Sequence, residues 1–191
     1  MVNPHLDVLI RVLWVLTPVY AANALATLPR GRGPPMDFGR DWPDGRRILG
    51  PSKTWSGFLF GTFAAVPIVL LQAWLILLAP PNLQLVPHYA STVLGALPVA
   101  FLLTGGAMTG DAIGSFVKRR LGYGSGDRVF GLDQLPFVLF PIGVGLVLFP
   151  SVFVVTFFSL EALFWVLLFT LGLHTLFNWI GFKLGTKKVP W

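Results

Sequence analysis

Residues 57–79 read GFLFGTFAAVPIVLLQAWLILLA, and this stretch decides the fold. It carries no Lys, Arg, Asp or Glu, and it is longer than the roughly 20 apolar residues that a helix needs to cross a bilayer. Four other stretches are also long and predominantly apolar, and each is bounded by charged residues, Pro or Gly. The five predicted spans are residues 6–28, 57–79, 89–109, 135–158 and 161–182. We therefore predict an all-α integral membrane protein with five transmembrane helices in a single domain, residues 1–191.

The composition of the whole chain also places the protein in a membrane. Hydrophobic residues make up 54% of the 191 residues and charged residues only 12%, against about 25% in a typical soluble domain. The mean hydropathy of +0.73 likewise excludes a soluble globular fold and a disordered chain. The absence of cysteine excludes disulfides and cysteine-ligated metal sites. Any chemistry must therefore take place in or at the bilayer, on short loops.

The basic residues are concentrated on one side of the predicted bundle. The connections at residues 29–56 and 110–134 are large and basic, whereas the two connections on the other side carry no Lys or Arg. The tail is also basic, through Lys183, Lys187 and Lys188. By the positive-inside rule we expect a multi-pass protein of the cell membrane, with both large loops and the C-terminus in the cytoplasm and the N-terminus outside. Arg11 is the exception, and it can snorkel outward or pair with Asp7.

Prolines and one amide interrupt the apolar spans. The span at residues 135–158 contains Pro136, Pro141 and Pro150, and we expect one kinked helix, because neighbouring helices can satisfy a broken backbone. Asn23 lies in the cytoplasmic half of the first span, where it either links helices or contacts a ligand at the loop mouth. The numerous Trp and Phe suit the membrane interface and the lipid-facing surface. Nothing in their placement indicates a nucleic acid as partner.

The first large loop ends in a pattern typical of anion binding. It reads Pro51-Ser52-Lys53-Thr54-Trp55-Ser56-Gly57 at the mouth of the second span. A Lys, hydroxyl groups and backbone N–H groups at a helix N-terminus together form a cradle for phosphate. The spacing is not that of a Walker A loop. The alternative is a basic loop that only touches anionic lipid headgroups.

The second large loop carries the more specific pattern. Asp111, Ser115 and Lys118 have the spacing i, i+4, i+7, which puts them on one face if the third helix continues. A carboxylate there suits Mg²⁺, while Lys118 and Arg119 suit phosphate oxygens. Asp133 begins the next span at the same depth, so both carboxylates can converge on one metal ion. This combination is typical of phosphoryl or nucleotidyl transfer; the alternative is a helix end with a surface ion pair.

The order of these motifs resembles a known family. Lys53-Thr54-Trp55-Ser56-Gly57 opens a helix, Gly110-Asp111 and Ser115-x2-Lys118-Arg119 follow, and Asp133-Gln134 opens the next helix. This order resembles the membrane CTP:phosphatidate cytidylyltransferase superfamily. The short length, the five spans and the Asp133-to-Phe137 ending are most similar to its archaeal branch, the CDP-archaeol synthase family. The longer diacylglycerol enzymes carry His-Gly-Gly and then Asp-Arg-x-Asp in the stretch that corresponds to residues 121–134. This chain has no His-Gly-Gly there, and Asp133 alone stands where that signature has two Asp residues.

The resemblance implies an activity and a set of residue roles. The reaction would transfer CMP from CTP to the isoprenoid ether lipid 2,3-bis-O-geranylgeranyl-glycerol 1-phosphate, giving CDP-archaeol and pyrophosphate. Asp111, Lys118 and Asp133 would be catalytic, with Mg²⁺ on the two carboxylates. Phosphate and ribose contacts would come from a second group: Lys53, Thr54, Gly57, Ser115 and Arg119. Asp37 and Asn23 would read the nucleoside.

Other functions remain compatible with parts of the pattern. A diacyl phosphatidate is an alternative acceptor, and the motifs do not select CTP over dCTP. A small transporter would need a polar pathway through the spans, and few polar residues lie there. A lipid-binding scaffold would tolerate substitutions that preserve charge. A CDP-alcohol phosphotransferase is disfavoured, because its Asp-Gly-x2-Ala-Arg motif is absent. The sequence selects no oligomeric state.

Overall fold

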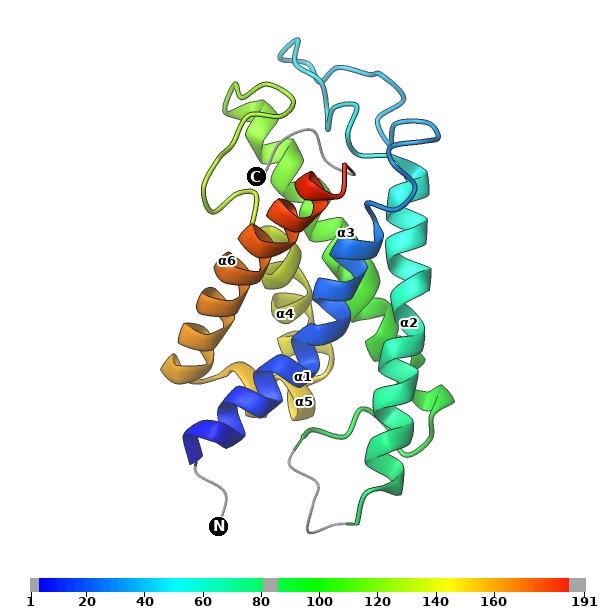
Figure 1. The fold of residues 1–191 in the computed structure, drawn as a ribbon, viewed down its shortest axis with the longest axis vertical. Coiled ribbons are helices and arrows are strands. Elements are labelled where there is room, and N and C mark those ends of the chain that lie inside the picture. Colours follow the sequence, from blue (N-terminus) through cyan, green and yellow to red (C-terminus); the bar gives the residue numbers. More distant parts are fainter. Residues whose placement is uncertain (1–3, 81–85, 186–191) are drawn as a thin grey trace.

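The computed structural model describes residues 4–80 and 86–185, and all regular elements in these ranges are helices (Figure 1). They are α1 (Pro4–Leu25), α2 (Trp55–Leu78), the 3₁₀ helix η2 (Leu94–Ala96), α3 (Leu97–Arg120), α4 (Pro136–Leu148), α5 (Pro150–Phe157) and α6 (Leu160–Lys183). The predicted all-α class is confirmed for this part of the chain. Lys187 and Lys188 of the predicted basic tail lie outside the described residues.

Several helices are suited to a bilayer. Helix α1, helix α2 and residues Leu94–Arg120 are each long and apolar enough to cross one. A fourth candidate joins α5 to Leu160–Leu173 of α6 and is bent by 85° at the break. Helix α4 is apolar but shorter. The described ranges therefore hold 3 candidate spans, or 4 if the bent pair is one span.

The structure corrects two predicted segments. Helix α3 begins at Leu97 and not at Tyr89, and it continues to Arg120, so the first part of the predicted loop 110–134 is helical. Residues 135–158 form α4 and α5 rather than one kinked helix. The break falls at Phe149, with φ −134° and ψ 57°, because Pro150 disfavours the helical conformation in the residue before it.

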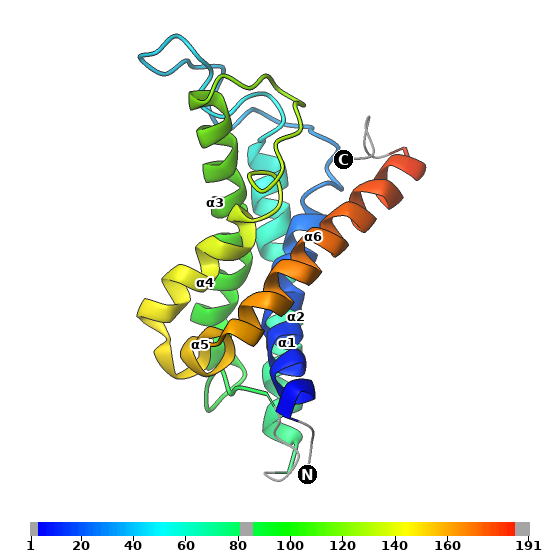
Figure 2. The same cartoon turned by 90° about the vertical axis from the view of Figure 1, so that its left-hand side faces the viewer.

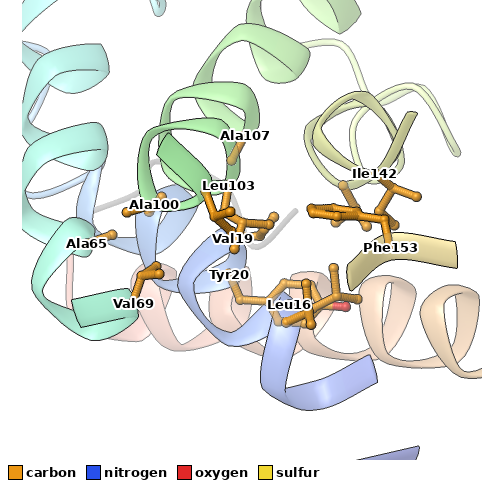
Figure 3. Packing of buried hydrophobic residues seen from close by; sticks show 14 of the residues in the cluster. Leu16, Val19, Tyr20, Ala65, Val69, Ala100, Leu103, Ala107, Ile142 and Phe153 are labelled. Atoms are coloured by element: carbon orange, nitrogen blue, oxygen red, sulfur yellow. The ribbon is translucent and has the colours of Figure 1, made fainter. Parts of the chain in front are cut away.

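Helix α3 is the centre of the bundle and packs against α1, α2 and α4. Fully buried side chains fill the space between these helices and α5, among them Leu16, Val19, Leu103 and Phe153 (Figure 3). Lipid is as apolar as these side chains, so close packing, rather than removal from water, holds membrane helices together. The core therefore positions the loop-side end of α3 through many small contacts.

Glycines bring α3 very close to α4 just below the loops. A Cβ at Gly110 would lie 2.2 Å from the carbonyl oxygen of Pro136. A Cβ at Gly106 would lie 2.9 Å from Pro141 Cβ, one turn further down α3. Any side chain at Gly110 would push the two backbones apart. The close contact thus fixes the neighbouring Asp111 relative to the start of α4.

Helix α6 leans away from α2 and α3 (Figure 2). It packs against α1, where the hydroxyl oxygens of Tyr20 and Thr170 are 3.0 Å apart. Near the N-terminal ends of both helices, His5 Nδ1 lies 3.0 Å from Glu161 Oε1. Helix α6 then returns toward the loop side of the molecule, and Figure 2 shows its last turns diverging from α1.

Candidate active site

A cavity of about 620 Å³ lies at the loop end of the bundle. Its wall is formed by the ends of α1, α2, α3 and α6, the start of α4 and both connecting loops. It is lined by nearly all of the predicted site residues, namely Asn23, Lys53, Thr54, Gly57, Asp111, Ser115, Lys118, Arg119 and Asp133. Apolar side chains complete the wall, including Leu28, Phe137 and Ile180. The cavity therefore offers charged and apolar surfaces side by side.

The last turns of α3 supply one polar face of the cavity. Because the helix is continuous to Arg120, Asp111, Ser115 and Lys118 share a face, as their spacing predicts. All three line the cavity. The side chain of Asp111 is 29% exposed, so its carboxylate is accessible from the cavity.

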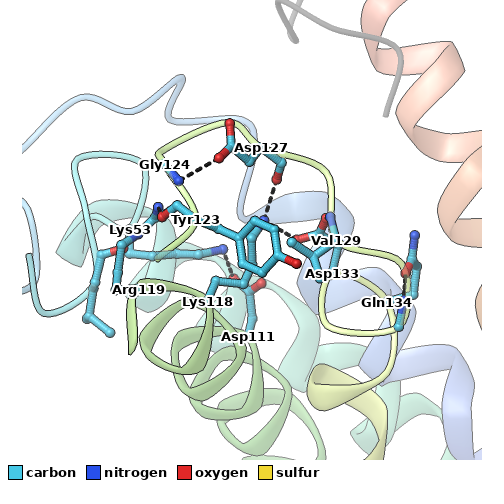
Figure 4. Close-up of polar contacts among 12 residues, drawn as sticks. Lys53, Asp111, Lys118, Arg119, Tyr123, Gly124, Asp127, Val129, Asp133 and Gln134 are labelled. Carbon is cyan, nitrogen blue, oxygen red and sulfur yellow. Dashed lines mark hydrogen bonds and ion pairs between the residues drawn. The ribbon is translucent and has the colours of Figure 1, made fainter. Parts of the chain in front are cut away.

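The first loop meets this face through a Lys–Asp pair. Lys53 Nζ donates a hydrogen bond to Asp111 Oδ2 (Figure 4). The next residue, Thr54, is the N-cap of α2, and its Oγ1 accepts from Gly57 N at 3.2 Å. A Cβ at Gly57 would lie 3.1 Å from the carbonyl oxygen of Ala26, so the glycine lets α2 begin close to the end of α1. The start of α2 thereby holds Lys53 at the cavity.

The second loop is folded around Lys118. The side chain of Lys118 is only 9% exposed, and its Nζ donates to Asp133 Oδ1 at 2.5 Å and to the carbonyl oxygen of Asp127 at 2.6 Å. The other oxygen of Asp133 accepts from Val129 N at 2.8 Å. These contacts hold the loop against the last turns of α3 (Figure 4). Lys118 and Asp133, both predicted as catalytic, are therefore bound to each other.

Arg119 and Arg120 connect the two loops. Arg119 is buried, and it donates from Nε to the carbonyl oxygen of Leu49 at 3.3 Å and from Nη1 to the carbonyl oxygen of Tyr123. Arg120 donates to two more carbonyl oxygens of the first loop, those of Arg46 and Arg47. Since each guanidinium reaches the backbone, the fold of both loops depends on the end of α3.

The structure corrects the predicted role of Asp37. Its side chain is fully buried and does not line the cavity, so it is not placed to read a nucleoside beside Asn23. Its carboxylate accepts from the guanidinium of Arg47 and from three backbone amides, those of Gly39, Leu49 and Gly50. Burial by itself raises the pKa of this carboxyl, but the hydrogen bonds outweigh burial, and the pKa lies well below its usual range. Asp37 therefore organises the first loop.

Two further arginines, which the sequence did not indicate as site residues, also line the cavity. Arg30 follows α1, and Arg128 lies in the second loop beside Asp127. The sequence indicated them only as members of basic loops, because neither belongs to a periodic segment or a motif.

Asp111 and Asp133, the two carboxylates predicted to hold Mg²⁺, both line the cavity. In the described residues no three His, Asp or Glu side chains come together as a metal cluster. Mg²⁺ commonly takes one or two carboxylates and completes its shell with substrate phosphates and water, so such a cluster is not required. Asp111 fits this role better than Asp133, because Lys53 contacts only one Asp111 oxygen whereas both Asp133 oxygens accept hydrogen bonds.

Comparison with known proteins identifies the family. The model of the CarS-like CDP-archaeol synthase family matches residues 5–191. The chain belongs to this family. The CDP-archaeol synthase of Thermococcus gammatolerans is 40% identical over 179 residues, which cover 94% of this chain and 94% of the relative. That of Archaeoglobus fulgidus is 38% identical over 187 residues, which cover 97% of this chain and 99% of the relative.

A solved structure of an intramembrane enzyme for archaeal membrane lipid biosynthesis shares the fold. Its TM-score to this chain is 0.62 at 34% sequence identity, and the match covers 85% of this chain and 91% of that one. The resemblance to the CDP-archaeol synthase family that the loop motifs indicated is thereby confirmed.

Proposed function

We propose that this chain transfers CMP from CTP to the phosphate of 2,3-bis-O-geranylgeranyl-glycerol 1-phosphate, giving CDP-archaeol and pyrophosphate. The relatives that match nearly its whole length bear the name of this activity. The observation on the chain itself that carries the proposal is the cavity, where carboxylates and basic side chains meet beside apolar helix ends. Such a boundary lets a water-soluble nucleotide meet the headgroup of a membrane lipid.

The reaction needs no general base from the protein. A phosphate monoester has a second pKa near 6 and is therefore already anionic at pH 7. One of its oxygens attacks the α-phosphorus of CTP, and the bond between this phosphorus and the α,β-bridging oxygen breaks as pyrophosphate leaves. The main barrier is the repulsion between the two anions, and positioned positive charges lower it.

Asp111 and Lys53 act as a pair in this proposal. Asp111, with Asp133 as a second ligand, would hold Mg²⁺, which neutralises phosphate charge when bound. Lys53 forms an ion pair with Asp111, so its ammonium stands beside the carboxylate that would hold the metal ion. From there Lys53 would contact the phosphate oxygens at the mouth of α2, where backbone N–H groups also favour anions.

The other predicted residues fall into two groups: those available to contact substrate and those that hold the loops and the start of α2 in place. Within the described ranges the amide of Asn23 and the hydroxyl of Ser115 make no hydrogen bond, and both line the cavity, so they are available to substrate oxygens. Lys118 and Arg119 hold the loops and add positive potential to the wall. Thr54 and Gly57 shape the start of α2.

We further propose five spans, with the short α4 and α5 together forming the fourth. The cavity would face the cytoplasm, because the basic loops gather at that end and the N-terminus of α1 lies at the other (Figure 1). This orientation gives the cavity access to cytoplasmic nucleotide.

The test is a transfer assay on purified protein in detergent. CTP labelled at the α-phosphate is supplied with Mg²⁺, and geranylgeranyl-ether lipid phosphate is compared with dioleoyl phosphatidic acid as acceptor. We expect label to enter the ether lipid faster than the diacyl lipid, and EDTA to abolish transfer. Folded protein that labels neither lipid contradicts the proposal, and preference for phosphatidic acid would assign the diacyl reaction instead.

A further inference from the structure

The basic side chains at the cavity fall into two groups. Lys53, Lys118 and Arg119 already bind a carboxylate or backbone carbonyls of the protein. Arg30 and Arg128 also line the cavity, but within residues 4–80 and 86–185 neither side chain makes a hydrogen bond or an ion pair. Both side chains are exposed. These two guanidinium groups are therefore the cavity cations available to a bound anion without loss of a protein contact.

The backbone that presents each arginine is fixed. On either side of Arg128, the carbonyl oxygen of Asp127 accepts from Lys118 Nζ at 2.6 Å and Val129 N donates to Asp133 at 2.8 Å. Arg30 N donates to the carbonyl oxygen of Thr27 at 3.0 Å, and Arg30 has a φ of 54°, in the left-handed region that residues other than Gly seldom adopt. Each uncommitted side chain thus extends from a turn that the structure holds in place.

The two arginines extend from different parts of the chain. Successive turns link Arg30 to the end of α1, since Thr27 N donates to the carbonyl oxygen of Ala24 at 3.2 Å. Leu28, two residues before Arg30, also lines the cavity. Arg30 therefore follows directly on a helix long and apolar enough to cross a bilayer, at an end where lipid headgroups would be met. Arg128 instead belongs to the loop packed on the last turns of α3, beside Lys118 and Asp133.

We infer that the two arginines divide the substrates, with Arg30 binding the phosphate of the lipid acceptor and Arg128 binding the phosphates of the nucleotide. This inference rests on the proposed function. Two anions must approach each other for the reaction, so a separate cation for each lowers their repulsion. The lipid phosphate is anchored at headgroup depth by its chains and meets Arg30, whereas the nucleotide enters from water and meets the second loop. A guanidinium binds phosphate bidentately, which suits both roles.

The experiment measures equilibrium binding and steady-state kinetics of four variants, Arg30→Gln, Arg128→Gln, Arg32→Gln and Arg40→Gln, in detergent. Arg32 and Arg40 are matched controls, because both are exposed loop arginines that do not line the cavity. Titration calorimetry with CTP and Mg²⁺, and separately with a dialkylglycerol phosphate, gives the two affinities without turnover. The transfer assay gives the two KM values.

We expect Arg30→Gln to lower the affinity for the lipid phosphate about tenfold and the affinity for CTP less than twofold, because one charge-assisted contact is lost. Arg128→Gln should show the reverse, both controls should stay within twofold of wild type, and Arg30→Lys should recover part of the lipid affinity. The inference is overturned if Arg30→Gln matches Arg32→Gln with both ligands, or if one arginine affects both ligands equally. Wild-type protein that binds both ligands but transfers no label would overturn the proposed function alone, since the affinities of the variants still test the division.

Discussion

Two carboxylates on the loop side of the molecule are held by basic partners in opposite ways. Asp37 is fully buried and accepts from Arg47 and from three backbone amides, so its oxygens have no capacity for a ligand. Asp111 is partly exposed to the cavity and, in the described part of the chain, its carboxylate accepts a hydrogen bond from Lys53 alone. The comparison shows that the number of donors separates a carboxylate that builds a loop from one that is available for chemistry.

The largest effect is expected from Asp111→Asn. If Asp111 holds Mg²⁺ and the nucleotide, the amide should lower kcat/KM at least about 100-fold, because a neutral group cannot replace the carboxylate. Stability should change little, since the side chain is partly solvated and has one partner. The measurements are the transfer assay and the thermal midpoint in detergent. Near-normal turnover would remove Asp111 from the metal site.

Lys118→Met should lower both activity and stability. Its expected effect on activity is smaller than that of Asp111→Asn and larger than that of Asp37→Asn. The change removes the donor to Asp133 and to the carbonyl oxygen of Asp127, so the second loop loses its anchor. We expect kcat/KM to fall about tenfold and the unfolding free energy to fall by about 1–2 kcal/mol. The stability loss is moderate because the Asp133 carboxylate is partly exposed and water can solvate it once Lys118 is gone. Unfolding in denaturant and the transfer assay check both values. Lys118→Arg should recover stability and activity together, because a guanidinium can still anchor the loop, and recovery of stability without activity would argue against a positioning role.

Asp37→Asn should show the opposite pattern to Asp111→Asn. The amide cannot accept from all four donors, and Arg47 loses its counter-charge, so we expect a loss of about 1–3 kcal/mol of unfolding free energy. Turnover at neutral pH should fall less than about threefold while the protein stays folded, because Asp37 is outside the cavity. Denaturant unfolding and the transfer assay measure the two effects. A loss of turnover as large as that of Asp111→Asn would show that Asp37 touches substrate.

The smallest expected effect is the pH dependence of the stability difference between wild type and Asp37→Asn. The pKa of Asp37 is lowered in the folded protein, so its contribution is fully present above the unfolded pKa of about 3.9 and is lost as the pH falls through the lower folded value. The stability gap between wild type and Asp37→Asn should therefore be constant from about pH 7 to about pH 5 and shrink below about pH 4. Thermal midpoints of both proteins across this range provide the check. A gap that widens in acid would contradict the assignment.

The sequence predicted those features that depend on local repetition. The apolar runs located α1, α2 and α6 to within a few residues, and helical spacing predicted the shared face of Asp111 and Lys118. The sequence could not predict that Asp37 organises the first loop, because the residues that donate hydrogen bonds to it lie in a loop without periodicity. Pro150 is a local signal for the break at Phe149, and the prediction of one kinked helix over residues 135–158 was wrong at this point. Arg30 and Arg128 stand out only once the partners of the other cations are known.

The hydrogen bonds of Arg119 and Arg120 have a consequence for how this region tolerates substitution. In the described part of the chain Arg119 binds only carbonyl oxygens of the loops, which every amino acid supplies, whereas Arg120 adds an ion pair with the side chain of Asp44 to its contacts with carbonyl oxygens. A saturation mutagenesis screen should therefore find positions 49 and 123 permissive and positions 119 and 120 restrictive. Apart from Asp44, the loop residues that Arg119 and Arg120 bind are free to diverge in sequence while the path of the loops over the end of α3 stays the same.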